Sequence, residues 1–131
     1  MKYLGIDFGL KHLGLALADG PLAEPFAEKK YQIETEALKF LNRICQEQNI
    51  ETIVIGLPEG KLAATVKTFG EQLKKLTNLA IFFQDETLST IEAKEKLLAA
   101  NAPRRKRRAD HRAAAALILQ EYLDTMKLKE A

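Results

Sequence analysis

The strongest constraint on the fold is a pair of short apolar runs separated by one helical segment. Ile53–Ile55 is a β-branched run that ends at a turn signal, and Leu79–Phe83 is a second apolar run of strand length. Between these runs, apolar residues recur at helical spacing from Leu62 to Leu76. Consecutive strands joined by a helical crossover run parallel. The pattern therefore predicts a parallel strand–helix–strand unit with both strands buried.

The rest of the chain predicts three more strands and three more helices. Strands are expected at residues 3–8, 12–18 and 25–33, with the first two forming an antiparallel hairpin and the polar third lying at an edge. Helices are expected at residues 35–48, from the capping box at Ser89 toward residue 100, and from about residue 110 to residue 126. This order predicts the α/β class, with a mixed five-stranded sheet covered by helices in one domain spanning residues 1–131.

Composition excludes several classes of protein. No apolar run approaches the roughly 20 residues that a membrane helix needs, so no membrane partner is expected. The chain leads directly into a strand rather than a signal peptide. The single Cys45 excludes an internal disulfide and a multi-cysteine zinc site. These features favour a cytoplasmic protein.

Three acidic residues are placed where elements of the predicted sheet end or begin. Asp7 lies near the end of the first strand, Glu86 lies just past the last strand, and Asp110 lies at the start of the last helix. Sites in open α/β sheets form at the carboxyl ends of parallel strands, so Asp7 and Glu86 are expected at one edge. Asp110 continues a stripe with Ala113, Ala114 and Leu117 that is expected to face the sheet.

Each acidic residue also has a purely structural explanation. Asp7 can be satisfied by backbone N–H groups of the following turn, Glu86 can be a solvated turn residue, and Asp110 can cap a helix or complement its dipole. Three carboxylates held together repel one another unless cations are present. A site made only of carboxylate oxygens suits Mg²⁺ or Mn²⁺, and such ions support phosphodiester cleavage.

Positive charge is concentrated just before the last helix. Residues 104–112 carry six basic side chains and one acidic side chain, a local charge of 6 − 1 = +5 against a net charge of +2 for the whole chain. A solvated charge run is one interpretation, and a grip on the phosphates of a nucleic acid is the other. The basic residues are Arg104, Arg105, Lys106, Arg107, Arg108 and Arg112.

Five motifs together resemble the YqgF/RuvX-like family, and the resemblance covers nearly the whole chain. They are Asp7-Phe8-Gly9-Leu10-Lys11, Gly14-Leu15-Ala16, Ile55-Gly56-Leu57-Pro58, Asp85-Glu86-Thr87-Leu88-Ser89-Thr90, and Asp110 with Ala113-Ala114. The family has the ribonuclease H-like fold and is described as Holliday-junction resolvases or nucleases of ribosomal RNA precursors. The resemblance implies that Asp7, Glu86 and Asp110 are catalytic metal ligands for Mg²⁺ or Mn²⁺. It also implies a nucleic-acid partner, either ribosomal RNA precursor or branched DNA.

The sequence departs from the family pattern at two positions. The family commonly has Arg where this chain has His12 and where it has Thr87, and both departures affect expected phosphate contacts. Lys11 is expected to neutralise charge or orient Asp7. The leading hypothesis is a metal-dependent nuclease that processes the 5′ end of pre-16S ribosomal RNA, as a monomer or homodimer. The alternatives are a Holliday-junction resolvase, a catalytically silent nucleic-acid-binding module, and a phosphotransfer ATPase, for which one domain is too small.

Overall fold

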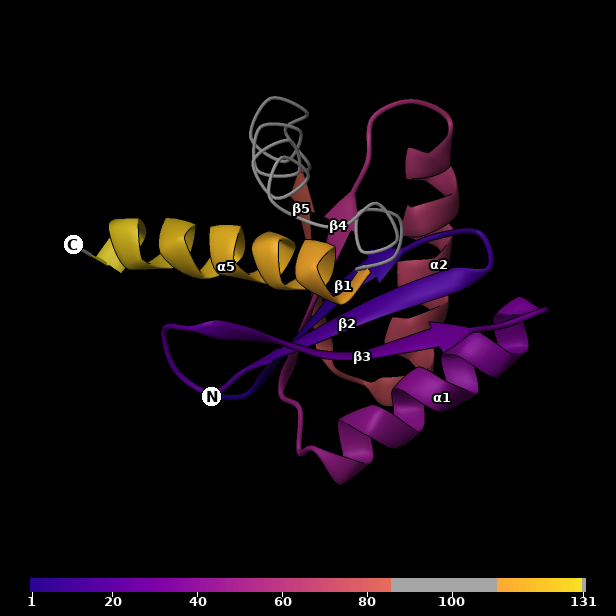
Figure 1. The fold of residues 1–131 in the computed structure, drawn as a ribbon, viewed down its shortest axis with the longest axis horizontal. Coiled ribbons are helices and arrows are strands. Elements are labelled where there is room, and N and C mark those ends of the chain that lie inside the picture. The colour runs from indigo at the N-terminus through magenta and orange to yellow at the C-terminus, as the bar shows by residue number, and fades with distance from the viewer. Residues whose placement is uncertain (86–110, 131) are drawn as a thin grey trace, which may run out of the picture.

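The computed structural model describes residues 1–85 and 111–130, which form one mixed sheet with helices on both faces (Figure 1). The strand order is β3-β2-β1-β4-β5. The predicted fold class is therefore confirmed. The elements are β1 (Tyr3–Phe8), β2 (His12–Ala18), β3 (Ala23–Lys30), α1 (Glu34–Glu47), β4 (Thr52–Leu57), α2 (Leu62–Thr77), β5 (Ala80–Asp85) and α5 (His111–Glu130).

The sheet is antiparallel on one side of β1 and parallel on the other. β1 pairs antiparallel with β2, and β2 pairs antiparallel with β3. β4 lies between β1 and β5 and pairs parallel with both. The C-terminal ends of β1, β4 and β5 therefore lie at the same end of the sheet. This confirms the expectation that the ends of the first and last strands meet at one edge.

The two faces of the sheet are covered by different helices. Leu4, Ile6 and Phe8 of β1 are buried in a cluster that includes α1 and α2 residues. Because side chains alternate along a strand, Gly5 and Asp7 face the opposite side, where α5 lies. Figure 1 shows α5 on one side of the sheet and α1 with α2 on the other. The first and last described elements thus meet on one face.

Two glycines of the sheet allow α5 to approach closely. A Cβ at Gly5 would lie 2.7 Å from Cβ of Leu119, and a Cβ at Gly14 would collide with the backbone carbonyl of His111. Both positions are therefore occupied by the one residue that leaves room for the helix. The close approach of α5 to the sheet therefore depends on glycines of the strands.

The buried stripe of α5 differs from the predicted one. Its buried residues are Ala115, Ile118, Leu119 and Leu123, whereas Ala113, Ala114 and Leu117 are only partly buried. The prediction that the stripe containing Ala113, Ala114 and Leu117 packs on the sheet was wrong. The sequence is ambiguous here because alanines occupy every position from 113 to 116, so apolar spacing does not single out one face.

Other differences are smaller. The third strand covers residues 23–30 rather than 25–33, and Pro25 lies within it beside a register shift. Proline is tolerated there because β3 is an edge strand, as predicted. Leu76, expected in the apolar stripe of α2, is 46% exposed. The helix predicted from Ser89 to residue 100 and the basic run at residues 104–108 lie outside the described residues.

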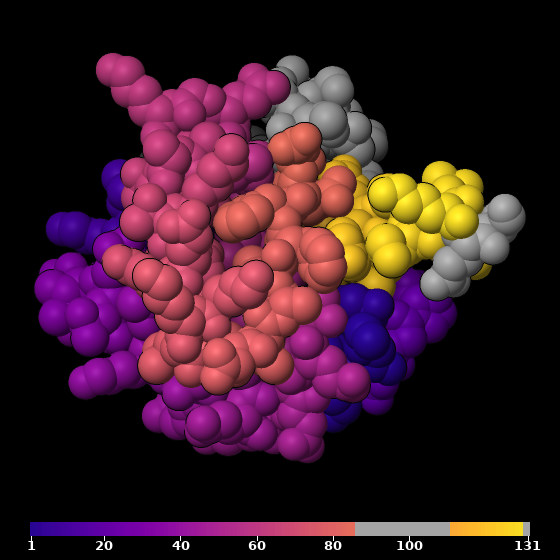
Figure 2. Space-filling model, turned by 180° about the vertical axis from the view of Figure 1, so that it is seen from behind, coloured from indigo at the N-terminus to yellow at the C-terminus, as the bar shows by residue number. Residues whose placement is uncertain are grey.

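The other edge strand, β5, lies at the surface between α2 and α5 (Figure 2). Its Phe82 is 46% exposed and stacks on Tyr122 of α5, with 5.6 Å between the ring centroids. Among the described helices, none is long and apolar enough to cross a membrane. Cys45 is buried in α1, and burial raises the pKa of its thiol to about 11. It is a residue of the hydrophobic core.

Candidate active site

Asp7 is the acidic residue around which the described part of the site is built. It lies at the penultimate position of β1, opposite Gly14 of β2. Gly14 in turn lies opposite Glu28 of β3, so these three residues form one row across the sheet. The Asp7 side chain is 21% exposed. Its carboxylate is therefore held in the protein surface with part of its area open to solvent.

The first residue of α5 lies directly over this row. His111 Nδ1 is 3.4 Å from Oδ2 of Asp7, a long hydrogen-bond distance. Burial raises the pKa of the Asp7 carboxyl above its ordinary value, and the hydrogen bond and charge of His111 oppose that rise. The net direction is upward, so the ionised carboxylate is under-compensated by the described residues. A site of this kind favours an added cation.

A second histidine supports the first. The rings of His12 and His111 are tilted by 31° to each other, with 4.4 Å between their centroids. His12 opens β2 after a tight turn in which the Gly9 N–H donates to the His12 carbonyl at 2.8 Å. The hydroxyl of Tyr31 donates to the Gly9 carbonyl, which ties this turn to the end of β3. Lys11 is exposed on the same turn.

The C-terminal end of β5 lies at the same end of the sheet as Asp7. Ile6, Ile55 and Phe83 form one cross-strand row. Asp7 is one residue past that row in β1, and Asp85 is two residues past it in β5. The other two predicted ligands are Glu86, which follows Asp85 in the sequence, and Asp110, which precedes His111. Both lie outside the described residues, and within the described ranges no three metal-binding side chains come together.

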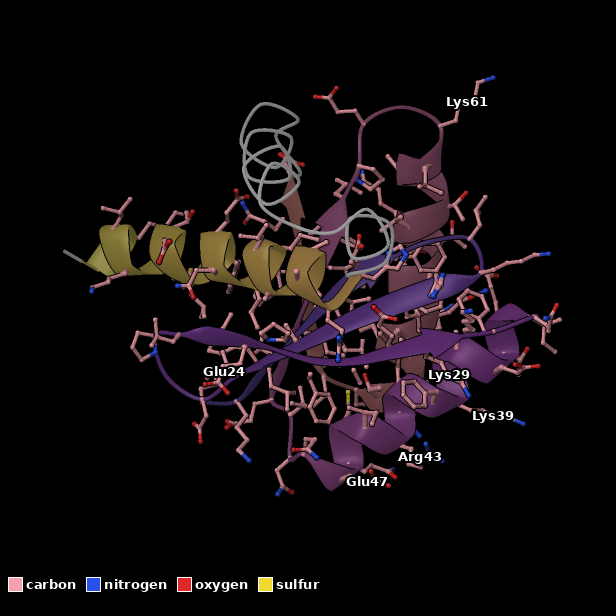
Figure 3. All side chains as sticks on the ribbon, viewed as in Figure 1. Glu24, Lys29, Lys39, Arg43, Glu47 and Lys61 are labelled. Carbon is pink, nitrogen blue, oxygen red and sulfur yellow. The ribbon has the colours of Figure 1, made fainter. Side chains whose placement is uncertain are left out.

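The predicted nucleic-acid-binding residues fall into two groups. Arg104 to Arg108 lie outside the described residues. Arg112 lies in the first turn of α5, where its Nε is 3.9 Å from a carboxylate oxygen of Glu28. Arg112 is thus placed beside the Asp7 row. Further positive charge lies away from the Asp7 face, where Lys29 and Arg43 each lie over the ring of Phe40 (Figure 3).

Sequence reasoning missed the histidine pair. His12 was noted only as a replacement of an arginine, and His111 was not singled out. The signal that was available is the position of His111 directly after Asp110. Nothing in the sequence indicates that the rings of His12 and His111, which lie 99 positions apart (111 − 12 = 99), are in contact.

Solved structures show which proteins share this fold. RuvC of T. thermophilus, solved in complex with a Holliday junction substrate, has a TM-score of 0.67 at 16% identity, and the match covers 97% of this chain and 96% of that one. The Fowlpox virus resolvase with Holliday junction DNA has a TM-score of 0.58 at 11% identity, covering 96% and 99% of the two chains. These matches place the chain in the class of proteins with a RuvC-like fold.

Within that class, the chain belongs to the RuvX family. The family model, described as "Holliday junction resolvase", matches residues 1–125. A relative from Endomicrobium trichonymphae is 38% identical, over 94% of this chain and 95% of its own. A relative from Geobacillus kaustophilus is 36% identical, over 97% and 100%. Both relatives are named "Putative pre-16S rRNA nuclease". The family resemblance seen in the sequence is confirmed.

Proposed function

We propose that residues 1–131 form one cytoplasmic nuclease domain that hydrolyses phosphodiester bonds at the 5′ end of pre-16S ribosomal RNA with Mg²⁺ or Mn²⁺. The observation that carries the proposal is Asp7. It is a partly buried carboxylate with a raised pKa at the edge where the parallel strands end, and the start of α5 lies over it. Such an under-compensated carboxylate in a surface site is typical of a functional site.

The donor chemistry fits a hard divalent cation. Asp7, Glu86 and Asp110 would supply carboxylate oxygens, the ligand type that Mg²⁺ and Mn²⁺ prefer. A bound cation of this kind activates water and neutralises charge that develops on the phosphate. Lys11 and Arg112 would contact the phosphate backbone beside Asp7.

Ribosomal RNA precursor is favoured over branched DNA because of the relatives. Those named for pre-16S rRNA are 34–38% identical over nearly the full length, whereas the junction resolvases are 11–16% identical and share the fold. Cleavage of RNA needs one copy of the site. Symmetrical cleavage of a junction would need two copies, so we propose that a monomer suffices and that a homodimer would accompany the alternative function.

The test is cleavage of pre-16S RNA and a four-way junction side by side, with Mg²⁺, Mn²⁺ or chelator. We expect divalent-dependent cleavage at the 5′ region of the RNA and little cleavage of the junction. Preferred cleavage of the junction, with two symmetric nicks, would instead support a resolvase. Tight binding of either nucleic acid with no cleavage under any metal condition would support a silent binding module.

We also expect the affinity for RNA to fall steeply with salt, because basic side chains at residues 104–108 would displace counterions from phosphates. Replacing Arg104, Arg105, Arg107 and Arg108 with Ala should weaken binding of all sequences about equally and flatten the salt slope. The measurement is a salt titration of wild type and variant by fluorescence anisotropy. A control variant replaces three cations of the other face, Lys29, Lys39 and Arg43, with Ala. Equal salt dependence of RNA affinity in wild type and the residue 104–108 variant would show that these residues do not contact the RNA.

A further inference from the structure

We propose that His111 is a positioning residue for Asp7 and that His12 fixes the ring of His111 by packing against it. The proposal rests on the proposed function, because it concerns how the Asp7 carboxylate is presented to a divalent cation. Neither histidine has been given a role by the sequence or by the family motifs. Both are assigned one here by their geometry relative to Asp7.

The contact between His111 and Asp7 involves one carboxylate oxygen. Nδ1 of His111 is 3.4 Å from Oδ2 of Asp7. A hydrogen bond to Oδ2 restricts the rotation of the carboxylate and leaves Oδ1 free of this contact. Ligating carboxylates are commonly held by such outer hydrogen bonds, and losing one typically weakens metal affinity or activity about 10–100-fold. A neutral imidazole with its proton on Nδ1 and an imidazolium both donate in this way, so the role does not depend on the charge of His111.

The backbone of His111 is placed by the sheet. Gly14, opposite Asp7 in the sheet, lies in contact with the His111 backbone, where a Cβ would lie 2.6 Å from Cβ of His111. This contact fixes where the His111 side chain begins, but a histidine on a helix still has free rotation about its side-chain bonds. A second contact is needed to select the rotamer that faces Asp7.

His12 supplies that second contact. Its ring lies 4.4 Å from the His111 ring, centroid to centroid, with an angle of 31° between the planes. His12 is itself anchored, because the turn between Gly9 and His12 is closed by a backbone hydrogen bond and tied to Tyr31. The turn therefore holds His12 in place, His12 packs against the ring of His111, and His111 contacts the Asp7 carboxylate.

The test separates stacking, hydrogen bonding and substrate contact with four single variants. His111→Ala removes the hydrogen bond, and His111→Asn keeps a short side-chain N–H donor. His12→Ala removes the stacking ring, and His12→Phe keeps a ring without polar atoms. Each variant is measured for Mn²⁺ affinity without nucleic acid, by electron paramagnetic resonance of free Mn²⁺, and for kcat and KM on the RNA. Thermal unfolding in chelator reports on the fold.

We expect His111→Ala to weaken Mn²⁺ binding and lower kcat by about 10–100-fold, with KM for RNA little changed. His111→Asn should recover a large part of both. His12→Ala should change both quantities in the same direction by less, and His12→Phe should behave like wild type. If His111→Ala fails to fold, the His111→Asn variant and the two His12 variants still test the proposal.

Three results would overturn the proposal. One is wild-type Mn²⁺ affinity and kcat in His111→Ala. Another is a raised KM with unchanged kcat in both His12 variants, because this would make His12 a substrate contact. The third is the absence of Mn²⁺ binding by the wild-type protein, which would overturn the metal site as well. If wild type binds Mn²⁺ but cleaves neither RNA nor junction, the proposed function fails and the Mn²⁺ affinities still test the positioning role.

Discussion

Replacing Asp7 with Asn is expected to abolish divalent-dependent cleavage and to raise the unfolding temperature measured in chelator by a few degrees. The change removes a charge with little change in volume, so the sheet and α5 should keep their places. Removing a proposed metal ligand should lower kcat by several orders of magnitude, as loss of a central catalytic group does. Stability should rise because burial raises the pKa of this carboxyl, which means that its ionised form destabilises the metal-free fold.

The stability gained by Asp7→Asn in chelator should depend on pH in a definite direction. A carboxyl whose pKa is raised in the folded state contributes stability when it is protonated, below its unfolded value of 3.8, and loses that contribution as the pH rises through the folded value. The stability difference between Asp7→Asn and wild type should therefore be largest at neutral pH and should shrink toward pH 4. Adding Mg²⁺ or Mn²⁺ should reverse the order, because a cation that binds the folded state stabilises only wild type.

The matched control is Asp19→Asn, which neutralises an exposed carboxylate in the connection between β2 and β3, at the opposite edge of the sheet. This variant should cleave like wild type and should gain no stability in chelator. The measurements are RNA cleavage and thermal unfolding at two pH values, with and without metal. Full cleavage activity in purified Asp7→Asn would show that Asp7 is not part of the active site.

Replacing Gly14 with Ala is expected to destabilise the protein by about 2–3 kcal/mol and to remove most of its activity. The new methyl group would collide with the backbone of His111, which belongs to a helix and cannot move without shifting α5. Shifting the start of α5 separates His111 from Asp7. Asp110, the residue before His111 and a proposed ligand, would be displaced with it. The measurements are unfolding free energy by urea titration and kcat at saturating metal.

Gly5→Ala is the control that separates instability from loss of the site. A Cβ at Gly5 also presses on α5, but farther along the helix, 2.7 Å from Cβ of Leu119 and 3.0 Å from the carbonyl of Ala115. We expect a comparable loss of stability with a much smaller loss of kcat at a temperature where both variants are folded. Equal losses of kcat in the two variants would mean that the position of His111 has no special importance.

The fold was largely predictable because strand and helix periodicities are strong in the first 85 residues. The runs at Ile53–Ile55 and Leu79–Phe83, with the helix between them, specify the parallel unit, and the structure places them as β4, α2 and β5. The stripe of α5 was not predictable in the same way. Four consecutive alanines give every face of the helix similar hydrophobicity, and the face that packs is selected by Gly5 and Gly14 on the sheet.

The candidate site was predictable only in part. Asp7 could be singled out because a carboxylate in an apolar strand requires an explanation, and the structure places it at the expected edge. The histidine pair required knowledge of how α5 crosses the sheet. The positions of Glu86, Asp110 and residues 104–108 lie outside the described residues, so their convergence with Asp7 stays a prediction.

The position of α5 in the chain has a consequence for when the enzyme becomes active. Asp7 is in the first strand, whereas His111 and the helix that lies over Asp7 come last among the described elements. During synthesis the sheet and its α1–α2 face can form from the first 85 residues, but Gly5, Gly14 and Val54 have no α5 to pack against until the final helix has left the ribosome. The Asp7–His111 contact is therefore formed last. A nascent chain from which α5 has not yet emerged would therefore lack the helix that lies over Asp7.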